Sequence, residues 1–325
     1  MPQHGKHKPR AVSMQFWPRV RAKRIYPIIK SWPSINNIQP VAFAGYKVGM
    51  THILTKEGKY VPVSIIETPP LKVLGVRLYK KDINKGFLSL KDIISNNFDE
   101  YVRRRIKTLE PNEDLEKGIQ DAERILDNVS LIRLIVYTQP WLTTIKKKKP
   151  EIFEMPIGGN NIKEIFNYVK NLLGNQIKIN DVFKEGEYVD VIGVTKGKGF
   201  QGEVKRYGIT VQYREVKRSK SVRHIGARGS RGMRRIFPTT PMPGQYGFFR
   251  RTEYNKLIIK ISDNYNEINP SSGWPHYGVV KNTYLMLKGS IIGAKKRLLI
   301  LRKAIRPPRN PEKIGIEYIS LLPKN

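Results

Sequence analysis

Short runs of apolar and β-branched residues, separated by Gly and Pro, dominate the hydrophobic pattern of the chain. Three such runs lie in residues 40–79, namely PVAFAGYKVGMTHIL, YVPVSIIETPP and LKVLGVRLY. Others lie at 133–140, 187–195, 256–261, 284–289 and 295–304, and the tail after residue 304 offers one more strand at most. Runs of this kind are typical of strands, and many short strands in one chain favour a β-barrel.

One stretch has a clear helical period instead. In NNIKEIFNYVKNLLGN the apolar positions recur every three or four residues, at Ile162, Ile165, Phe166, Val169, Leu172 and Leu173. Asn160 or Asn161 can cap the start of this helix and Gly174 can end it, and its apolar stripe is expected to pack on a sheet. Residues 87–127 are also predicted to be mainly helical, from the cluster FDEYVRRRIKTLE and the mixed-charge stretch that follows.

These elements predict a mainly β fold with an α/β insertion. Residues 1–39 form an extended basic N-terminal arm with the pairs Trp17-Pro18 and Trp32-Pro33 and little periodicity. The predicted parts are then 40–86, the first part of a barrel; 87–180, the insertion; and 181–325, the second part of the barrel. A long basic loop, 200–251, leaves the barrel between two of its strands.

Charge narrows the choice of partner. The 325 residues include 60 Lys and Arg against 27 Asp and Glu, a net charge of +33. A compact body with this charge repels itself unless a polyanion compensates it, and nucleic acid is the leading candidate. There is no cysteine, no apolar run after the basic N-terminus that would make a signal peptide, and no stretch of 18 apolar residues. The protein is therefore expected to be soluble, intracellular and without a membrane partner.

The positive charge is concentrated. Residues 196–251 hold fifteen Lys and Arg and two acids, whereas residues 82–127 hold eleven acids and eight bases. Within the basic segment, the stretch 222–251 has no clear period and mixes arginines with glycines, prolines and aromatic residues. Arginine binds phosphate through paired donors, and aromatic rings stack on bases. A hairpin of some fifty residues reaches about 80 Å at most, which suits penetration into a large folded RNA.

Other chemistry has weaker support. GKGFQG at 197–202 satisfies G-x-G-x-x-G, so an enzyme with a nicotinamide cofactor stays an alternative. The sequence EVKRYGITVQYREV that follows is β-rich where a helix is needed, and no acid stands at the spacing that would hold a ribose. The five histidines form no metal-binding or catalytic pattern, so neither a metal, a cofactor nor a small-molecule substrate is expected. A general binder of polyanions is the other alternative.

Several long collinear segments resemble the large-subunit ribosomal protein L3 family. They are VAFAGYKVGMTHI (41–53), SIIETPP (64–70), DVIGVTKGKGFQGEVKRYG (190–208), GQYGFFRRTEYNK (244–256) and HYGVVKNTYLMLKGSIIGAKKRLLILRKA (276–304). The N-terminal HGKHKPRAVSMQFWPRVRAKR is similar to the archaeal and eukaryotic branch of that family. The resemblance covers nearly the whole chain.

The resemblance implies a six-stranded barrel of the elongation-factor type and a structural role in the large ribosomal subunit, without enzymatic activity. It implies binding to large-subunit RNA near its 3′ domain, early in assembly, beside neighbouring ribosomal proteins, with the loop tip approaching the peptidyl-transferase centre. In the branch a tryptophan stands at the loop tip, where this chain has Arg231, so the role of that tryptophan is not carried over. The residues expected to bind RNA are Lys6, Arg10, Trp17, Arg19, Arg21, Lys23, Arg24, Lys196, Lys198, Lys205, Arg206, Arg218, Lys220, Arg223, Arg228, Arg231, Arg234, Arg235, Arg250 and Arg251.

Overall fold

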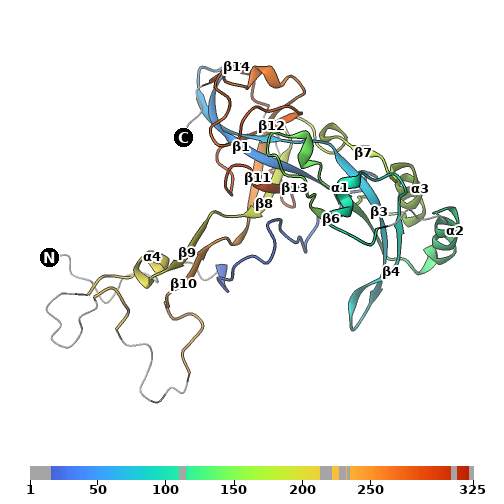
Figure 1. Cartoon of the computed structure of the whole chain (residues 1–325), viewed down its shortest axis with the longest axis horizontal. Helices are drawn as coiled ribbons and strands as arrows, with labels where there is room; N and C mark the ends of the chain where they lie inside the picture. Colours follow the sequence, from blue (N-terminus) through green and yellow to red (C-terminus); the bar gives the residue numbers. More distant parts are fainter. Residues whose placement is uncertain are drawn as a thin grey trace. The chain divides into compact units, whose positions relative to one another are not determined.

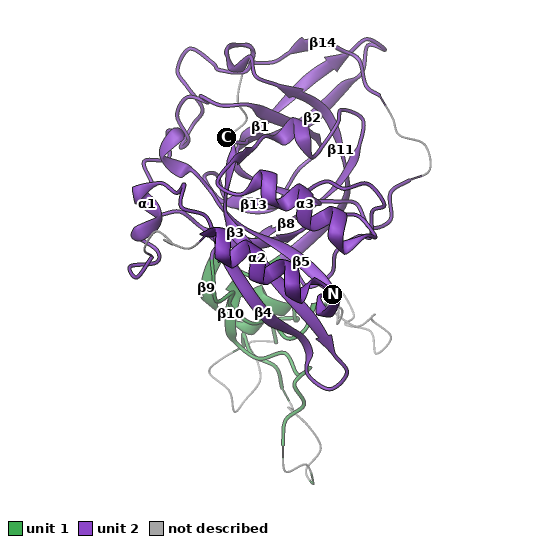
Figure 2. Cartoon of the chain, turned by 90° about the vertical axis from the view of Figure 1, so that its right-hand side faces the viewer, with its two compact units in different colours: residues 1–24, 194–250 green, residues 25–193, 251–325 purple. Residues whose placement is uncertain are grey.

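A computed structural model describes residues 16–109, 115–212, 222–226, 232, 235–308 and 313–321. The chain divides into two compact units, each built from segments that are distant in sequence (Figure 2). Unit 1 comprises residues 1–24 and 194–250, and unit 2 comprises residues 25–193 and 251–325. The predicted boundaries near residues 39, 86 and 180 separate the arm, the barrel and the insertion along the sequence, and do not define compact units. They stay a prediction.

Unit 2 is mainly β, as predicted, and its larger sheet has seven strands. Their bounds are β1 (Ala42–Thr55), β2 (Tyr60–Glu67), β8 (Tyr188–Val194), β11 (Arg250–Ser262), β12 (Tyr284–Lys288), β13 (Leu298–Lys303) and β14 (Ile316–Ile319). They lie in the order β13-β8-β11-β12-β2-β1-β14 (Figure 1). Six of them coincide with predicted apolar runs, although β11 begins earlier and β13 later than expected, and β14 is the one further strand that the tail was expected to offer.

Six of these strands form a closed cycle of pairings. Strand β13 pairs with β8, where Ile300 lies opposite Ile192, and also with β1, where Ile300 lies opposite Ala44. Apolar residues from all six strands are fully buried and join one core, among them Phe43, Ile65, Val191, Ile258, Leu285 and Leu301. Nonlocal pairing of short apolar strands therefore builds the body of unit 2.

The second sheet of unit 2 contains β3 (Leu71–Asp82), β4 (Gly86–Ile94), β5 (Leu131–Tyr137), β6 (Ile152–Pro156) and β7 (Gln176–Ile177). Helix α3 (Ile162–Leu172) packs on it as expected: Asn161 accepts a hydrogen bond from the backbone of Lys163, and Gly174 follows the helix end. The prediction that residues 87–127 are mainly helical was wrong. Most of the first eight residues pair with β3, and the helices α1 (Glu100–Arg103) and α2 (Leu115–Ile125) are short.

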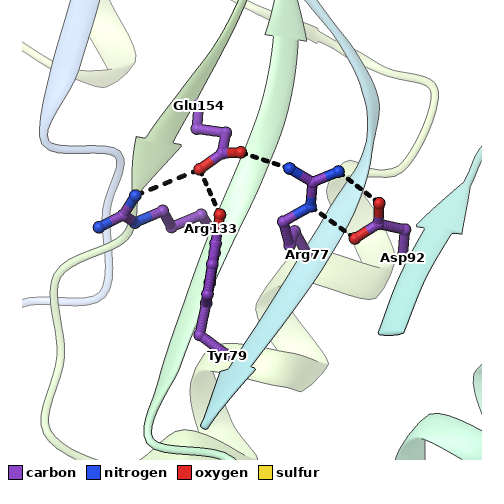
Figure 3. Close-up of polar contacts among 5 residues, drawn as sticks. All are labelled: Arg77, Tyr79, Asp92, Arg133 and Glu154. Atoms are coloured by element: carbon purple, nitrogen blue, oxygen red, sulfur yellow. Dashed lines mark hydrogen bonds and ion pairs between the residues drawn. The ribbon is translucent and has the colours of Figure 1, made fainter. Parts of the chain in front are cut away.

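A polar ladder crosses four strands of this sheet (Figure 3). Arg77 on β3 makes a paired contact with Asp92 on β4, at 2.6 and 2.5 Å, and reaches Glu154 on β6 at 2.7 Å. Glu154 also accepts hydrogen bonds from the Tyr79 hydroxyl at 2.6 Å and from Arg133 at 3.2 Å. The contact with Asp92 raises the pKa of Arg77, and burial raises the pKa of Tyr79. The ladder fixes the register of this half-exposed sheet face.

Unit 1 contains a two-stranded sheet of β9 (Gly197–Gln201) and β10 (Gly244–Gly247) and the helix α4 (Glu203–Tyr207). One sequence interpretation fails here in part. The stretch after Gly202, which is β-rich in sequence, begins with the helix α4, and Gly208 ends this helix in a left-handed conformation. The stretch 222–251, which has no clear period, contains the short strand β10 and the first residues of β11.

Candidate nucleic-acid interface

The base of the basic loop is a β-hairpin whose geometry depends on Gly247. Opposite residues in β9 and β10 include Gln201 with Gly244 and Phe200 with Gln245. Gly247 has a φ of +69°, and a Cβ at this position would lie 2.1 Å from the carbonyl oxygen of Lys196. No side chain fits there, so glycine is required at position 247 for the two limbs of the loop to meet.

Arg206 joins helix α4 to the returning limb. Its Nε donates to the carbonyl of Gln245 at 3.0 Å, and its Nη1 donates to the carbonyl of Met242 at 2.7 Å. The side chain is half-buried. Two guanidinium donors are therefore engaged with the backbone, and this arginine organises the loop base whether or not it also meets a phosphate.

The N-terminal arm packs against the same base. The Trp17 ring stacks on Tyr207 with 5.8 Å between centroids, and the Arg19 guanidinium lies 4.6 Å from the Tyr207 centroid. Arg19 also donates from Nη1 to the carbonyl of Arg206 at 2.8 Å. We call Trp17, Arg19, Arg206 and Tyr207 the arm–loop cluster. Through it, two distant segments of the chain form one basic surface, since Arg19 and Arg206 are 187 residues apart in the sequence.

A second contact lies farther along the arm. The backbone N–H of Ala22 donates to the carbonyl of Phe248 at 2.8 Å, and the Arg21 guanidinium lies 5.1 Å from the Phe248 ring centroid. On the adjacent strands the Lys198 ammonium lies 4.9 Å from the ring centroid of Tyr246. Cations therefore lie over aromatic rings at several points, an arrangement that favours both phosphate and base contacts.

One acid is buried among these cations. Glu203, at the start of α4, accepts a hydrogen bond from the backbone N–H of Ile225 at 2.5 Å. Gln212 contributes two more contacts to the same part of the loop, from its backbone to Val222 at 2.9 Å and from its side chain to His224 at 3.2 Å. The carboxylate of Glu203 thus binds the backbone of the loop.

The structure divides the residues predicted to bind RNA into three groups. Half-buried residues are Trp17, Arg19, Arg206 and Arg251. Exposed residues are Arg21, Lys23, Arg24, Lys196, Lys198, Lys205, Arg223, Arg235 and Arg250. Outside the described residues lie Lys6, Arg10, Arg218, Lys220, Arg228, Arg231 and Arg234.

The sequence assigned no role to two residues of the site: Tyr207 holds the arm, and Glu203 holds the returning loop. Tyr246, one of the aromatic residues expected among the arginines, lies under Lys198. Their signal in the sequence is weak, because a lone aromatic or acidic residue in a basic stretch has many interpretations. A buried acid among fifteen cations is nevertheless an unusual feature, and this could have marked Glu203 as structural.

The geometry of GKGFQG differs from a dinucleotide-binding turn. Gly197–Gln201 is a strand of the loop hairpin rather than a strand-to-helix turn, and α4 has five residues. Among the described residues no group of three or more His, Asp or Glu could hold a metal ion. Within the same residues no helix is long and apolar enough to cross a membrane.

Comparison with known proteins gives consistent matches over the full length. The family model described as ribosomal protein L3 matches residues 1–322. The chain is similar to the large ribosomal subunit protein uL3 of Nanoarchaeum equitans, with 53% identity over 329 residues and 100% of each chain covered. It is 44% identical to uL3 of Methanocaldococcus jannaschii (98% of each chain) and 46% identical to uL3 of Sulfolobus acidocaldarius (96% of each chain).

Proposed function

Because the chain belongs to the ribosomal protein L3 family, we propose that it is a structural constituent of the large subunit that binds large-subunit RNA near its 3′ domain. It is not an enzyme, in keeping with this family. It acts in the cytoplasm, within the large subunit. Its contributions there are support of early assembly and of the peptidyl-transferase centre, through the basic loop 200–251.

The arm–loop cluster is the observation that best supports RNA binding. It joins the arm and the loop base, two basic segments, at Tyr207 and at the Arg206 carbonyl. Ordering both segments before RNA arrives lowers the entropy lost on binding. The cations exposed around the cluster, such as Lys198, Lys205 and Arg21, then meet phosphates from a defined surface.

The closed cycle of six strands supports a barrel of the elongation-factor type as the mount for this loop. The chain leaves the larger sheet after β8, passes through unit 1 and returns as β11. These strands are neighbours in the sheet, so both ends of the loop are fixed by the same ladder of hydrogen bonds. In this proposal residues 40–86 and 181–325 form the barrel, residues 87–180 form the insertion, and residues 1–39 form the arm.

We assign RNA contacts to all three groups of predicted residues, with different roles. The exposed lysines and arginines neutralise phosphates, and Trp17, Arg19 and Arg206 also hold the arm and the loop base together. The remaining cations, Arg231 at the predicted loop tip among them, belong to the same basic loop and arm in sequence. Neighbouring large-subunit proteins are the other partners.

Sedimentation of a native extract through a sucrose gradient at high salt tests this function. A protein threaded into folded RNA stays with the large subunit, because salt of about 1 M screens exposed charge pairs beyond roughly 3 Å but does not remove buried segments. Co-migration with the large subunit is the expected result. Release to the top of the gradient would identify a peripheral binder of polyanions and would exclude a structural role.

A further inference from the structure

The segment GKGFQG, which does not form a dinucleotide-binding turn, carries the most exposed phenylalanine of the chain. Phe200 is 75% exposed, against 56% for Phe237 and 50% for Phe87. It lies on β9, which pairs with β10 at the base of the basic loop (Figure 1). Single exposed apolar residues are ordinary, so the backbone, the space and the charge around this ring decide what it binds.

A β-bulge directly before Phe200 fixes the direction of this side chain. The register of β9 against β10 shifts there, and Lys198 and Gly199 together oppose the single residue Tyr246. Gly199 has a φ of +64°, a left-handed conformation that glycine adopts without strain. The Gln201 side chain donates to the Lys198 carbonyl at 2.6 Å across the bulge. Since bulges re-aim the side chains next to them, the Phe200 ring is presented by a defined backbone.

The space beside the ring is open. A Cβ added at Gly199 or at Gly202 would meet no other atom within 4 Å. Gln245 lies opposite Phe200 on β10, and its side-chain amide donates to two carbonyls of its own strand, at 3.4 and 3.0 Å. Gln245 is therefore held along β10, and a flat group has room to lie against the ring.

The charge near the ring favours an anion. Lys196 and Lys198, before and within β9, are exposed, and so is Lys205 on the helix that follows. In the part of unit 1 that the structure describes, Glu203 is the only acid, and it is buried and bound to the backbone of Ile225. A flat group that carries negative charge at its edge is a nucleotide: its base stacks on an aromatic ring and its phosphate meets a cation. An apolar protein segment would use the ring and leave these lysines without a counter-charge.

We propose that Phe200 stacks on an unpaired base of large-subunit RNA, with Lys196 and Lys198 at the flanking phosphates. This inference rests on the proposed function and deepens it, because Phe200 is not among the residues expected to bind RNA. The base is an unpaired one, since bases inside an RNA helix are already stacked. Stacking tolerates all four bases, so the contact adds affinity and fixes position without reading sequence. GKGFQG then acts as one unit, in which glycines supply space, lysines supply charge and the ring supplies the stacking face.

A substitution series at position 200 tests the stacking face. Filter binding of the full chain to large-subunit RNA should be about 5- to 150-fold weaker for Phe200→Ala. Phe200→Leu keeps an apolar side chain without a π-face and should stay close to Phe200→Ala, whereas Phe200→Trp should bind at least as tightly as the unchanged chain. Recovery by leucine equal to that by tryptophan, or unchanged affinity in Phe200→Ala, would overturn the proposal.

Two further readouts separate stacking from loss of charge or of structure. The slope of log affinity against log salt should be the same in all three variants, because no cation is removed. The melting temperature should also be unchanged, since the ring is exposed. Phe87→Ala, at an exposed phenylalanine of unit 2, is the matched control and should bind like the unchanged chain. A loss of affinity in Phe87→Ala equal to that in Phe200→Ala would contradict a specific site.

Photo-crosslinking in intact large subunits identifies the partner directly. Benzoylphenylalanine replaces Phe200, and the subunits are washed at high salt before irradiation. The expected result is an adduct with one short stretch of large-subunit RNA, mapped as a stop in primer extension. An adduct with a subunit protein, or no adduct with RNA, would overturn the proposal while leaving the proposed function intact. Loss of the unsubstituted chain from washed large subunits would instead refute the proposed function.

Discussion

The carboxylate of Asp190 on β8 accepts a hydrogen bond from Nη2 of Arg302 on β13 at 2.5 Å, and both side chains are buried. Asp190 also accepts from the backbone N–H groups of Asn255 at 3.1 Å and Ile305 at 3.3 Å. Arg302 reaches the carbonyl of Ser31 at 2.7 Å. One ion pair thus joins two neighbouring strands of the cycle to a segment that precedes the first strand of the chain.

Replacing Arg302 by Met is expected to lower the free energy of unfolding by about 3–5 kcal/mol, because Asp190 is left as an uncompensated buried charge. Urea denaturation of the full chain measures this change. Lys303→Met is the matched control: Lys303 is the adjacent residue, and its contact with Glu187 is longer, at 3.8 Å. The same decrease in the free energy of unfolding in both variants would show that the buried pair contributes no more to stability than the longer Lys303–Glu187 contact.

Lowering the pH is expected to destabilise unit 2, in part through protonation of Glu267. Its hydrogen bond from Lys260 lowers the pKa of Glu267 below the usual 4.5, and Tyr284 and Asn264 donate to the same carboxylate. Since the pKa is lowered in the folded state, the stabilisation is present above about pH 4.5 and is lost as the pH falls through the folded-state pKa. Glu267→Gln should cost less than about 1 kcal/mol near neutral pH, because the pair is partly solvated, and nothing once Glu267 is protonated.

Urea denaturation at constant ionic strength between neutral pH and pH 3 measures the Glu267 effect. Glu317→Gln, at an exposed position on β14, removes one carboxylate without these contacts. The difference in the free energy of unfolding between Glu267→Gln and the unchanged chain should shrink as the pH falls. A difference that grows instead would contradict the prediction.

The parts of the fold that follow from local pattern were predictable, and the parts that depend on tertiary pairing were not. Helix α3 was predicted with its cap because its apolar stripe and Asn161 act within one segment. Strand β4 was missed because Phe87, Leu88 and Leu90 are apolar but exposed. The polarity of its residues therefore does not separate buried positions from exposed ones. In the site, the arginines were predicted from charge, but the stacking of Trp17 on Tyr207 depends on a nonlocal contact that no spacing encodes.

Removal of the Trp17 ring is expected to release the arm from the loop base. The substitution Trp17→Ala deletes a stacked contact with Tyr207 and leaves Arg19 with one aromatic neighbour instead of two. These terms are worth about 1–2 kcal/mol together, so opening of the arm should become roughly 5–30 times more frequent.

Limited trypsin digestion of the free full chain measures this opening as the rate of cleavage after Arg21 and Lys23. Trp17→Phe, which keeps a ring, should lie between the unchanged chain and Trp17→Ala. Val20→Ala is the control, because the Val20 side chain is 62% exposed and close to the same cleavage sites. Equal cleavage rates for Trp17→Ala and Val20→Ala would show that the stack does not hold the arm.

The exposed lysines of unit 1 and the half-buried Arg206 are expected to differ in how they affect RNA binding. Replacing Lys196, Lys198 and Lys205 by Gln removes three cations from the exposed surface, and each lost phosphate contact lowers the slope of log affinity against log salt by about 0.7–0.9. The triple variant should therefore lose about 2–3 units of slope, with its melting temperature unchanged. Arg206→Gln should instead lower the melting temperature, because the Arg206 side chain binds the carbonyls of Met242 and Gln245.

Filter binding of the full chain to large-subunit RNA, over a series of salt concentrations, measures the slope, and thermal denaturation measures stability. Replacing Lys80, Lys81 and Lys85 by Gln removes the same charge from exposed positions of the β3–β4 hairpin in unit 2. An equal loss of slope in both triple variants would mean that RNA senses only the net charge of the chain, as a general polyanion binder requires. A loss confined to the unit 1 variant would locate the phosphate contacts on the surface that the arm–loop cluster organises.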